Sequence, residues 1–345
     1  MSDISFKMTV ATNVGLVRTN NEDNFIVNPN LSKPNNWFVP SSSEEVLSLG
    51  KDGCVMVVAD GMGGMNAGEV ASEIAVNHVK DAFSNVKDFS KINDCSNHIE
   101  SFLKSCVVDA DAAIKKRVKE DPDTSGMGTT IVIAWIVGNM AHVVWCGDSR
   151  AYIFNRNSGL SRLSRDHSYV QELVDSGQLD PELAFDHPNS NIITRSLGDS
   201  SAKAQPDYVC KRLSAGDYIL LCTDGLCGLV RDEDTLNILM QPYGSLEDYR
   251  LALFNAAFEA GGYDNVTIAL FECVSVEEEE SVLGGTLSPV EVDKKNKEKK
   301  AQKKKRGVMT FIIALIVILI ALVAMAVGLD IITIDVANAI QFNLK

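Results

Sequence analysis

Four aspartates of this sequence each stand at the end of a short apolar run, beside or near a glycine. Asp60 follows VMVVA, Asp148 follows HVVWC, Asp224 follows YILLC, and Asp264 precedes VTIAL. Apolar β-branched runs of this length predict buried strands, so the four carboxylates can converge on one edge of a sheet. Carboxylates gathered there would repel one another, and divalent cations would remove that repulsion. An all-oxygen site prefers Mg²⁺ or Mn²⁺ to Zn²⁺. Any one of these aspartates could be an ordinary turn former, so the prediction depends on the set of four.

Two neighbouring features extend this predicted metal centre. Gly61 has no side chain, so its backbone carbonyl could approach a metal closely. Arg18 offers a planar fork suited to two hydrogen bonds with a phosphate, although an isolated arginine is more often a surface residue. Glu22 and Asp23 follow in the same segment and would place two more carboxylates near a metal or its waters. Arg18, Glu22 and Asp23 are therefore candidate catalytic residues.

The elements that must position these residues are short strands and amphipathic helices. Buried strands are predicted at Val55–Ala59, Thr129–Val137, Met140–Cys146, Ala151–Phe154, Tyr218–Cys222 and Val266–Phe271. Apolar residues at helical spacing predict helices at Ala67–Phe83, Ser96–Val118 and Leu246–Ala260. Hairpin-connected strands with helices in blocks predict an α+β fold, a sandwich of sheets flanked by helices. The polar segments Asn28–Gly53 and Leu160–Ser190 are expected to be surface excursions.

Composition and charge exclude several classes of protein. The chain has 345 residues, 46% of them hydrophobic, which excludes a wholly disordered chain. Its net charge of −14 is uneven. From Lys294 onward ten Lys and Arg face three acidic residues, a net of +7, so residues 1–293 carry −21. This acidic region argues against a general nucleic-acid binder. The eight cysteines have no paired spacing, which is typical of buried thiols in a reducing compartment.

The C-terminal region predicts a membrane anchor. Val308–Leu329 is 22 residues without a charge. As a helix it would be about 33 Å long, against a hydrocarbon core of ~30 Å; a buried core helix is the alternative. Nine Lys and Arg precede it, which predicts residues 1–306 in the cytoplasm and Asp330–Lys345 across the cell membrane. The basic run before the span suits anionic lipid head groups, and nucleic acid is its weaker interpretation.

These patterns divide the chain into four parts. We expect a catalytic domain at 1–274, a charged flexible linker at 275–306, a transmembrane helix at 307–329 and a short extracytoplasmic tail at 330–345.

Eight short motifs occur in the order found in one enzyme family. They are RTNNED (18–23), DGMGG (60–64), GTT (128–130), GDSR (147–150), DHS (166–168), TRSLG (194–198), TDG (223–225) and GYDN (262–265). Together they resemble the metal-dependent serine/threonine protein phosphatases of type 2C, above all the bacterial cytoplasmic members. The resemblance runs from about Thr9 to Cys273.

The resemblance implies a central antiparallel β-sandwich flanked by helices on both sides, with a metal centre at one end. Asp60 would bridge two Mg²⁺ or Mn²⁺ ions, and the Gly61 carbonyl would bind one of them. Asp224 and Asp264 would hold the other ion. Asp148, together with Asp224, would hold a weaker third ion, as in bacterial members of the family.

The resemblance also implies how substrate would be handled. Arg18 would bind the substrate phosphate, Glu22 and Asp23 would support metal-bound waters, and Leu160–Ser190 would be a mobile flap beside the site. Animal members of the family have a histidine directly after the Asp-Gly pair as candidate general acid, and this chain has Met62, as bacterial members do. The proton donor would then be a metal-bound water or a group that the sequence does not identify.

The expected function is metal-dependent hydrolysis of phosphoserine and phosphothreonine in proteins by a metal-activated water, opposing a Ser/Thr kinase. The catalytic domain is expected to be monomeric. Two alternatives remain open. One is a non-catalytic, membrane-tethered scaffold, which the presence of Asp60, Asp224 and Asp264 disfavours. The other is a metallohydrolase of small phosphate compounds, which a comparison of phosphopeptides with nucleotides or pyrophosphate would separate.

Overall fold

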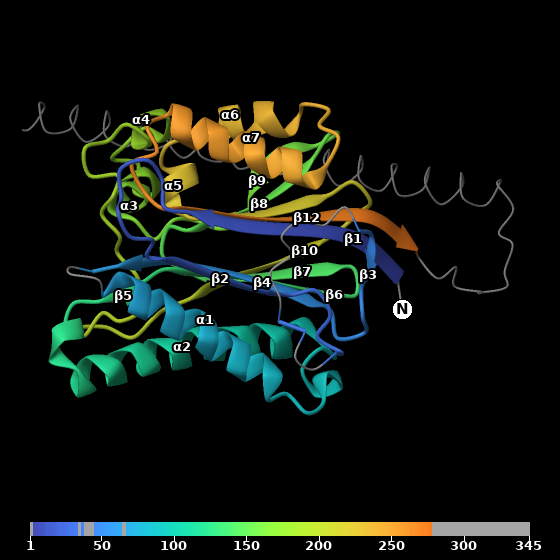
Figure 1. The fold of residues 1–345 in the computed structure, drawn as a ribbon, viewed down its shortest axis with the longest axis horizontal. Helices are drawn as coiled ribbons and strands as arrows, with labels where there is room; N and C mark the ends of the chain where they lie inside the picture. The colour runs from blue at the N-terminus through green and yellow to red at the C-terminus, as the bar shows by residue number, and fades with distance from the viewer. Residues whose placement is uncertain (1–2, 34–35, 38–44, 64–66, 278–345) are drawn as a thin grey trace, which may run out of the picture. The chain divides into compact units, whose positions relative to one another are not determined.

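Two antiparallel sheets lie face to face, and helices cover the outer face of each (Figure 1). The computed structural model describes residues 3–277, apart from 34–35, 38–44 and 64–66. These residues fall in a unit that contains Met1–Glu279. The strands are β1 (Asp3–Asn13), β2 (Asp23–Asn28), β3 (Leu47–Ser48), β4 (Cys54–Met62), β5 (Gly128–Thr129), β6 (Ile131–Val137), β7 (Met140–Cys146), β8 (Arg150–Asn155), β9 (Gly159–Arg162), β10 (Asp207–Arg212), β11 (Tyr218–Cys222) and β12 (Val266–Glu277).

The first sheet has the order β3-β1-β12-β11-β8-β9, and the second has the order β10-β7-β6-β4-β2, with β5 paired to β4. The helices are α1 (Gly68–Ser84), α2 (Ser96–Glu120), α3 (Tyr169–Asp175), α4 (Pro181–Ala184), α5 (Asp224–Cys227), α6 (Asp232–Leu239) and α7 (Leu246–Glu259), with short 3₁₀ turns at Phe89–Lys91 and Pro122–Thr124. Helices α1 and α2 pack on the second sheet, and α5 and α7 pack on the first.

The central strands read as continuous apolar runs because both of their faces are buried. In β4, Val55 and Val57 face α1 and α2, whereas Met56 and Val58 face the other sheet. A strand covered on both sides needs apolar residues at every position, and an alternating pattern would bury polar groups. Trp135 of β6 is fully buried in the core on the helix side of the sheet, where its indole nitrogen donates to the Asp52 carbonyl at 2.9 Å.

The α+β class and the antiparallel arrangement predicted from the sequence are confirmed. The strands at Met140–Cys146 and Tyr218–Cys222 have the predicted bounds, and the three predicted helices differ from the observed ones by at most two residues at either end.

Two expectations need correction. Ser275, the residue at which the linker was predicted to begin, lies in β12, which continues to Glu277, and Val276 pairs with Ile4 of β1. The surface excursion expected from Leu160 also starts later, because β9 forms the edge of the first sheet.

The rest of the predicted linker, the transmembrane helix at 307–329 and the tail at 330–345 lie outside the described residues. Within the described ranges, no helix has the length and apolar character needed to cross a membrane.

Candidate metal centre

The predicted site residues meet at one end of the sandwich. Asp60 lies near the end of β4, directly opposite Asp23, the first residue of β2. Asp148 lies in the connection from β7 to β8, Asp224 begins α5 just after β11, and Asp264 comes two residues before β12. Antiparallel pairing brings these strand ends together, because β11 pairs with both β8 and β12. Segments far apart in the sequence thus supply one group of carboxylates.

Burial and neighbouring carboxylates raise the pKa values of these aspartates. Desolvation raises the pKa of Asp60 well above its usual range, and the charges of Asp224 and Asp23 raise it further. The pKa values of Asp148 and Asp224 are also raised, first by desolvation and then by neighbouring carboxylates. Negative charge concentrated in this way favours a bound cation.

Unused oxygen atoms show that these residues fit a divalent metal. The Oδ1 atoms of Asp23, Asp148 and Asp224 are buried and accept no hydrogen bond from the protein. A buried acceptor without a partner is costly, and hard cations take oxygen ligands of this kind. The described part of the chain has no three of these carboxylate oxygens within 4.8 Å of one another, so the set is open rather than closed around a point.

Gly61 is required by close backbone approach rather than by a special torsion angle. A Cβ atom built at this position would lie 2.2 Å from the Gly68 carbonyl oxygen and 2.5 Å from that of Glu22. Its own N–H donates to the Glu22 carbonyl at 3.1 Å. A side chain at this position would therefore collide with the backbone, and metal binding by the Gly61 carbonyl stays a prediction.

Asp23 is held by two threonine hydroxyls to which the sequence analysis gave no role. Its Oδ2 accepts from Thr223 Oγ1 at 2.9 Å and from Thr267 Oγ1 at 2.7 Å. Burial raises the pKa of Asp23 to about 7, although both hydroxyl bonds act to lower it. The role of Thr223 could have been predicted from the sequence, because this residue stands beside the strand-end Asp224 in the TDG motif. Thr267, inside β12, carries no such signal.

The side chains of Arg18 and Asp264 form an ion pair with each other, although the sequence predicted a phosphate partner for Arg18 and a metal partner for Asp264. Arg18 Nη2 donates to Asp264 Oδ2 at 2.8 Å, and the two side chains are 50% and 36% exposed. This bond is the main cause that raises the pKa of Arg18. The predicted phosphate-binding arginine and a predicted metal ligand thus neutralise each other at the mouth of the site.

Glu22 is positioned through its backbone. Its N–H donates to Asn265 Oδ1 at 2.7 Å, and the Asn265 amide in turn donates to the carbonyls of Val14 and Asn20, both at 2.9 Å. Desolvation raises the pKa of the half-buried Glu22 side chain. Asn265 is therefore the residue that ties the N-terminal segment to the start of β12, a role that the sequence analysis did not assign.

A cleft of about 850 Å³ opens beside the carboxylates. One side of the cleft is formed by Asp148, Asp224 and Asp264. Another side is formed by Val170 and Phe185, which belong to the segment predicted to be a flap. The cleft is thus large enough for a peptide side chain and open to solvent, and its lining includes three of the predicted metal ligands.

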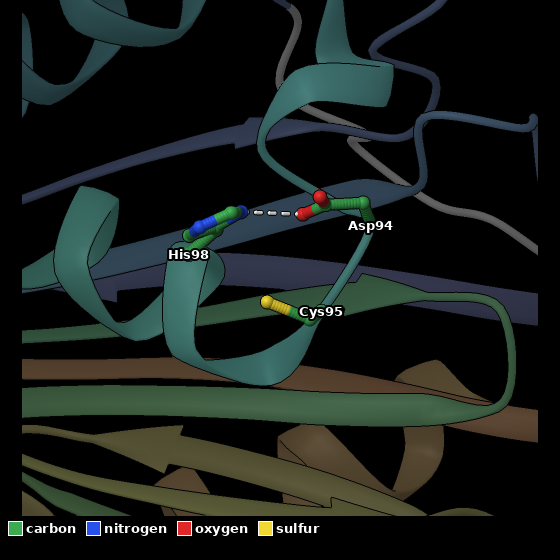
Figure 2. Close-up of side chains that lie close together, drawn as sticks. All are labelled: Asp94, Cys95 and His98. Atoms are coloured by element: carbon green, nitrogen blue, oxygen red, sulfur yellow. Dashed lines mark hydrogen bonds and ion pairs between the residues drawn. The ribbon is translucent and has the colours of Figure 1, made fainter.

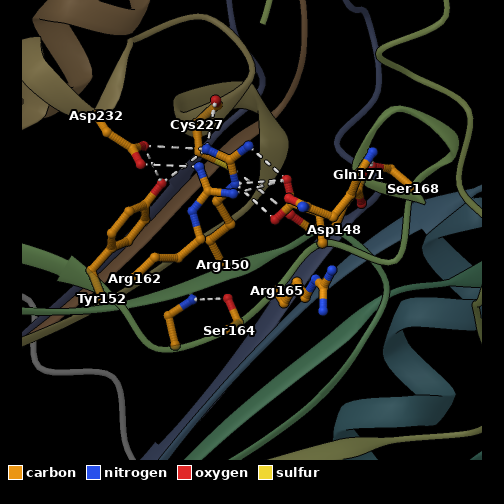
Figure 3. A network of polar contacts seen from close by, with 12 residues as sticks. Asp148, Arg150, Tyr152, Arg162, Ser164, Arg165, Ser168, Gln171, Cys227 and Asp232 are labelled. Carbon is orange, nitrogen blue, oxygen red and sulfur yellow. Dashed lines mark hydrogen bonds and ion pairs between the residues drawn. The ribbon is translucent and has the colours of Figure 1, made fainter. Parts of the chain in front are cut away.

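A buried ionic network fixes the wall next to Asp148 (Figure 3). Arg150 makes two-pronged hydrogen bonds to Asp166 at 2.7 to 3.1 Å and also bonds Tyr152 and Asp232. Arg162 bridges the same two aspartates. Two-pronged arginine–carboxylate pairs are geometrically specific, so this network orients the loop that carries Asp148.

His167 has a structural position. Its ring is buried, its Nδ1 accepts from the Gly147 N–H at 3.1 Å, and its Nε2 lies 3.1 Å from Asp207 Oδ2. The described residues that line the cleft include no histidine. The absence of a histidine at Met62 is therefore not compensated by one elsewhere in the described lining.

Comparisons with known proteins agree with this fold. Residues 46–255 match the family model of protein phosphatase 2C. The chain is 33% identical over 275 residues to the protein phosphatase PhpP of Streptococcus pneumoniae, covering 80% of this chain and 99% of that protein. It is 32% identical over 276 residues to the serine/threonine protein phosphatase PstP of Mycobacterium tuberculosis, covering 79% of this chain. This chain therefore belongs to the protein phosphatase 2C family.

A solved structure extends the comparison to metals. The catalytic domain of PstP in complex with two manganese ions has a TM-score of 0.61 and 29% identity to this chain, covering 80% of it and all of that domain. The match to full-length PstP covers only 46% of that protein.

Proposed function

We propose that this chain hydrolyses phosphoserine and phosphothreonine in proteins with the help of divalent metals. The observation that carries the proposal is the convergence of strand-end aspartates at one end of the sandwich, with three buried carboxylate oxygens that lack protein partners. PhpP and PstP, whose names describe protein phosphatases, support the choice of reaction.

The residues suited to hold two Mg²⁺ or Mn²⁺ ions are Asp60, the Gly61 carbonyl, Asp224 and Asp264, with Asp148 and Asp224 suited to a weaker third. Such ions, when bound, supply Lewis-acid activation of a water and neutralise charge on the phosphoryl group. The protein contributes a set of oxygens already fixed by the ends of β4, β11 and β12. Preorganised ligands lower the cost of reorganisation when charge develops.

The substrate phosphate would be bound by Arg18. Its guanidinium is half exposed and paired only with Asp264 among the described side chains. If Asp264 bound a metal instead, the guanidinium of Arg18 would be free to donate two hydrogen bonds to phosphate oxygens. Glu22 and Asp23 would accept hydrogen bonds from water in the site, and the hydroxyls of Thr223 and Thr267 would keep Asp23 in place. The adjoining cleft would receive the peptide.

Turnover of a phosphothreonine peptide by the full-length chain tests the proposal. Activity should require Mn²⁺ or Mg²⁺, disappear with EDTA and return on adding metal. Asp224→Asn should abolish it, whereas Asp234→Asn, at an exposed position in α6, should leave it unchanged. Activity that survives chelation would contradict the mechanism. Faster turnover of nucleotides or pyrophosphate than of phosphopeptides would favour a small-molecule phosphohydrolase.

We also propose that a single helix at 307–329 tethers the enzyme to the cell membrane with its catalytic domain in the cytoplasm. The support is the uncharged run Val308–Leu329 with nine basic residues before it. We propose further that the catalytic domain is monomeric and that a Ser/Thr kinase supplies its substrates. A reporter fused after Lys345 should be active only outside the cytoplasm, and a cytoplasmic signal would refute the orientation.

A further inference from the structure

A second group of metal-ligating side chains lies at the start of α2, in the described part of the chain. One oxygen of Asp94, the sulfur of Cys95 and one ring nitrogen of His98 lie within 4.8 Å of one another, and all three residues are exposed (Figure 2). We propose that these residues bind one transition-metal ion of the Zn²⁺ class, at a site separate from the carboxylate centre. This proposal does not depend on the phosphatase activity.

The local backbone brings the three ligands together. Helix α2 begins at Ser96, Cys95 is its N-cap, and the N–H groups of His98 and Ile99 both lie 3.2 Å from the Cys95 carbonyl oxygen. The first turn of the helix thus folds His98 back over the two residues that precede the helix. His98 Nδ1 lies 2.6 Å from Asp94 Oδ1, so two of the donor atoms already lie in contact.

The thiol of Cys95 is not used to stabilise the helix. Serine, threonine, aspartate or asparagine normally occupy the N-cap because their oxygens accept hydrogen bonds from the first turn. In this chain Ser168 and Ser245 cap α3 and α7 in that way, but the Cys95 side chain caps no backbone N–H. The thiol sulfur instead lies within 4.8 Å of an Asp94 oxygen and of a His98 ring nitrogen. All three polar groups therefore face one another rather than the helix.

The donor set selects a different metal from the first site. Thiolate and imidazole suit Zn²⁺ and related ions, whereas the aspartates near β4 suit Mg²⁺ or Mn²⁺. Binding would replace the Cys95 S–H bond with a sulfur–metal bond and release one proton to solvent. The charges of the thiolate and Asp94 would then balance a divalent ion. Three protein ligands leave one tetrahedral position for water, as expected for an exposed site.

The start of α2 lies away from the carboxylate centre, because the part of α2 that is linked to the end of β4 lies further along the helix. Asp111 on this helix accepts from the Gly198 N–H at 2.8 Å, and Gly198 lies against Gly128, whose strand β5 pairs with the end of β4. Cys95 lies sixteen residues before Asp111, which is about 24 Å along a helix at ~1.5 Å per residue. Occupancy at the start of α2 should therefore leave the carboxylate centre unchanged.

A second cysteine–histidine pair in the fold serves as an internal control. Cys210 Sγ lies 4.0 Å from His142 Nε2, and the other ring nitrogen of His142 is bonded to Tyr208 at 2.7 Å. His142 is buried, and this pair does not belong to a group of three ligands in the described residues. Of the cysteines described, Cys95 is exposed and Cys210 is half-buried, while the remainder are buried.

Cobalt is the probe, because Co²⁺ replaces Zn²⁺ and reports sulfur ligation by a near-ultraviolet charge-transfer band. The full-length chain is reduced, stripped of metal with EDTA, freed of the chelator and titrated with Co²⁺. We expect one sulfur-to-cobalt band per chain in the wild type and in Cys210→Ser, lost in Cys95→Ser and weakened at least tenfold in apparent affinity in His98→Ala. Co²⁺ bound by aspartates alone gives no such band, so the two sites are distinguished in one titration.

Two further measurements extend the test. Zn²⁺ should remove the band at one equivalent, and Mn²⁺-supported turnover should be the same in Cys95→Ser as in the wild type. The proposal is overturned if the folded, reduced wild type shows no band, if the band persists in Cys95→Ser, or if it disappears in Cys210→Ser. Circular dichroism of each variant confirms that the comparison is between folded proteins.

Discussion

The carboxylate centre and the Asp94–Cys95–His98 group bring side chains suited to metal binding together in opposite ways. The carboxylate centre draws residues from Asp60 to Asp264, and the end of a sandwich brings them together. The group at α2 lies within five consecutive residues and needs only one helical turn. The carboxylate centre is partly desolvated and offers only oxygen atoms as ligands. The group at α2 is exposed and offers an oxygen, a sulfur and a nitrogen.

The difference shows what burial contributes. At the carboxylate centre desolvation raises the pKa of Asp60, Asp148 and Asp224, so negative charge is costly there and a cation relieves that cost. At the α2 group the pKa of the exposed Asp94 is lowered by its bond to His98, and water already stabilises the charge. We therefore expect metal binding at the first site to be coupled to both stability and activity, and metal binding at the second site to leave activity unchanged.

The largest effect should come from replacing a carboxylate of the first site. Asp60→Asn should lower Mn²⁺-supported turnover of a phosphothreonine peptide by more than about 100-fold, the upper end of the loss typical for residues that only support a metal's ligands. Cys95→Ser, measured in parallel, should change turnover by less than about twofold, since it touches no residue of the site. Comparable losses in both variants would remove the functional distinction between the two regions.

Metal binding should stabilise the fold mainly through the first site. Mn²⁺ at a hundred-fold excess over its dissociation constant should raise the free energy of unfolding by roughly 2.7 kcal/mol. Thermal unfolding of the EDTA-stripped chain, with and without Mn²⁺, measures this. Asp224→Asn should lose most of the shift and Asp94→Asn should retain it. An equal shift in Asp224→Asn would place the stabilising ion elsewhere.

Gly61→Ala should disturb the first site through its backbone. The added methyl group would meet two main-chain carbonyl oxygens that cannot move independently, so we expect a loss of about 1–3 kcal/mol in the free energy of unfolding, with reduced turnover. Gly244→Ala is the matched control, since its nearest neighbour is Asp248 Oδ2 at 3.6 Å. Denaturant unfolding of both variants would measure the difference, and equal stability would contradict the close approach at Gly61.

The buried His142 should make the stability of the fold depend on pH. Burial lowers the pKa of His142 to about 4, below the ordinary value of 6.5, so the folded state binds fewer protons than the unfolded state between these values. Stability should therefore fall as the pH drops from about 6.5 to 4, by roughly 1–2 kcal/mol more in the wild type than in His142→Gln. Denaturant unfolding at several pH values decides this, and identical profiles for His142→Gln and the wild type would contradict it.

Some strands were not predicted from the sequence, because their residues form no continuous apolar run. In β1 the buried residues Ile4, Phe6 and Met8 alternate with more exposed positions, so no continuous apolar run marks the strand. Strand β10 lies at a sheet edge and is only partly buried, which permits polar residues such as those at 211 and 212. Continuous runs were found because strands covered on both faces need them, and half-covered strands do not.

Local patterns by themselves determined the covered strands, the three long helices and the aspartates at the strand ends, because hydrophobic periodicity and turn chemistry act over a few residues. The spacing of Asp94, Cys95 and His98 was likewise present in the sequence, but a helix had to start at Ser96 for it to become a cluster.

Only the tertiary structure decided that Asp23 stands opposite Asp60, that Thr267 donates to Asp23, and that Arg18 pairs with Asp264. The last two contacts join residues more than 240 positions apart. The pairing of β1 with β12 brings these segments together, and no short-range sequence pattern predicts that pairing.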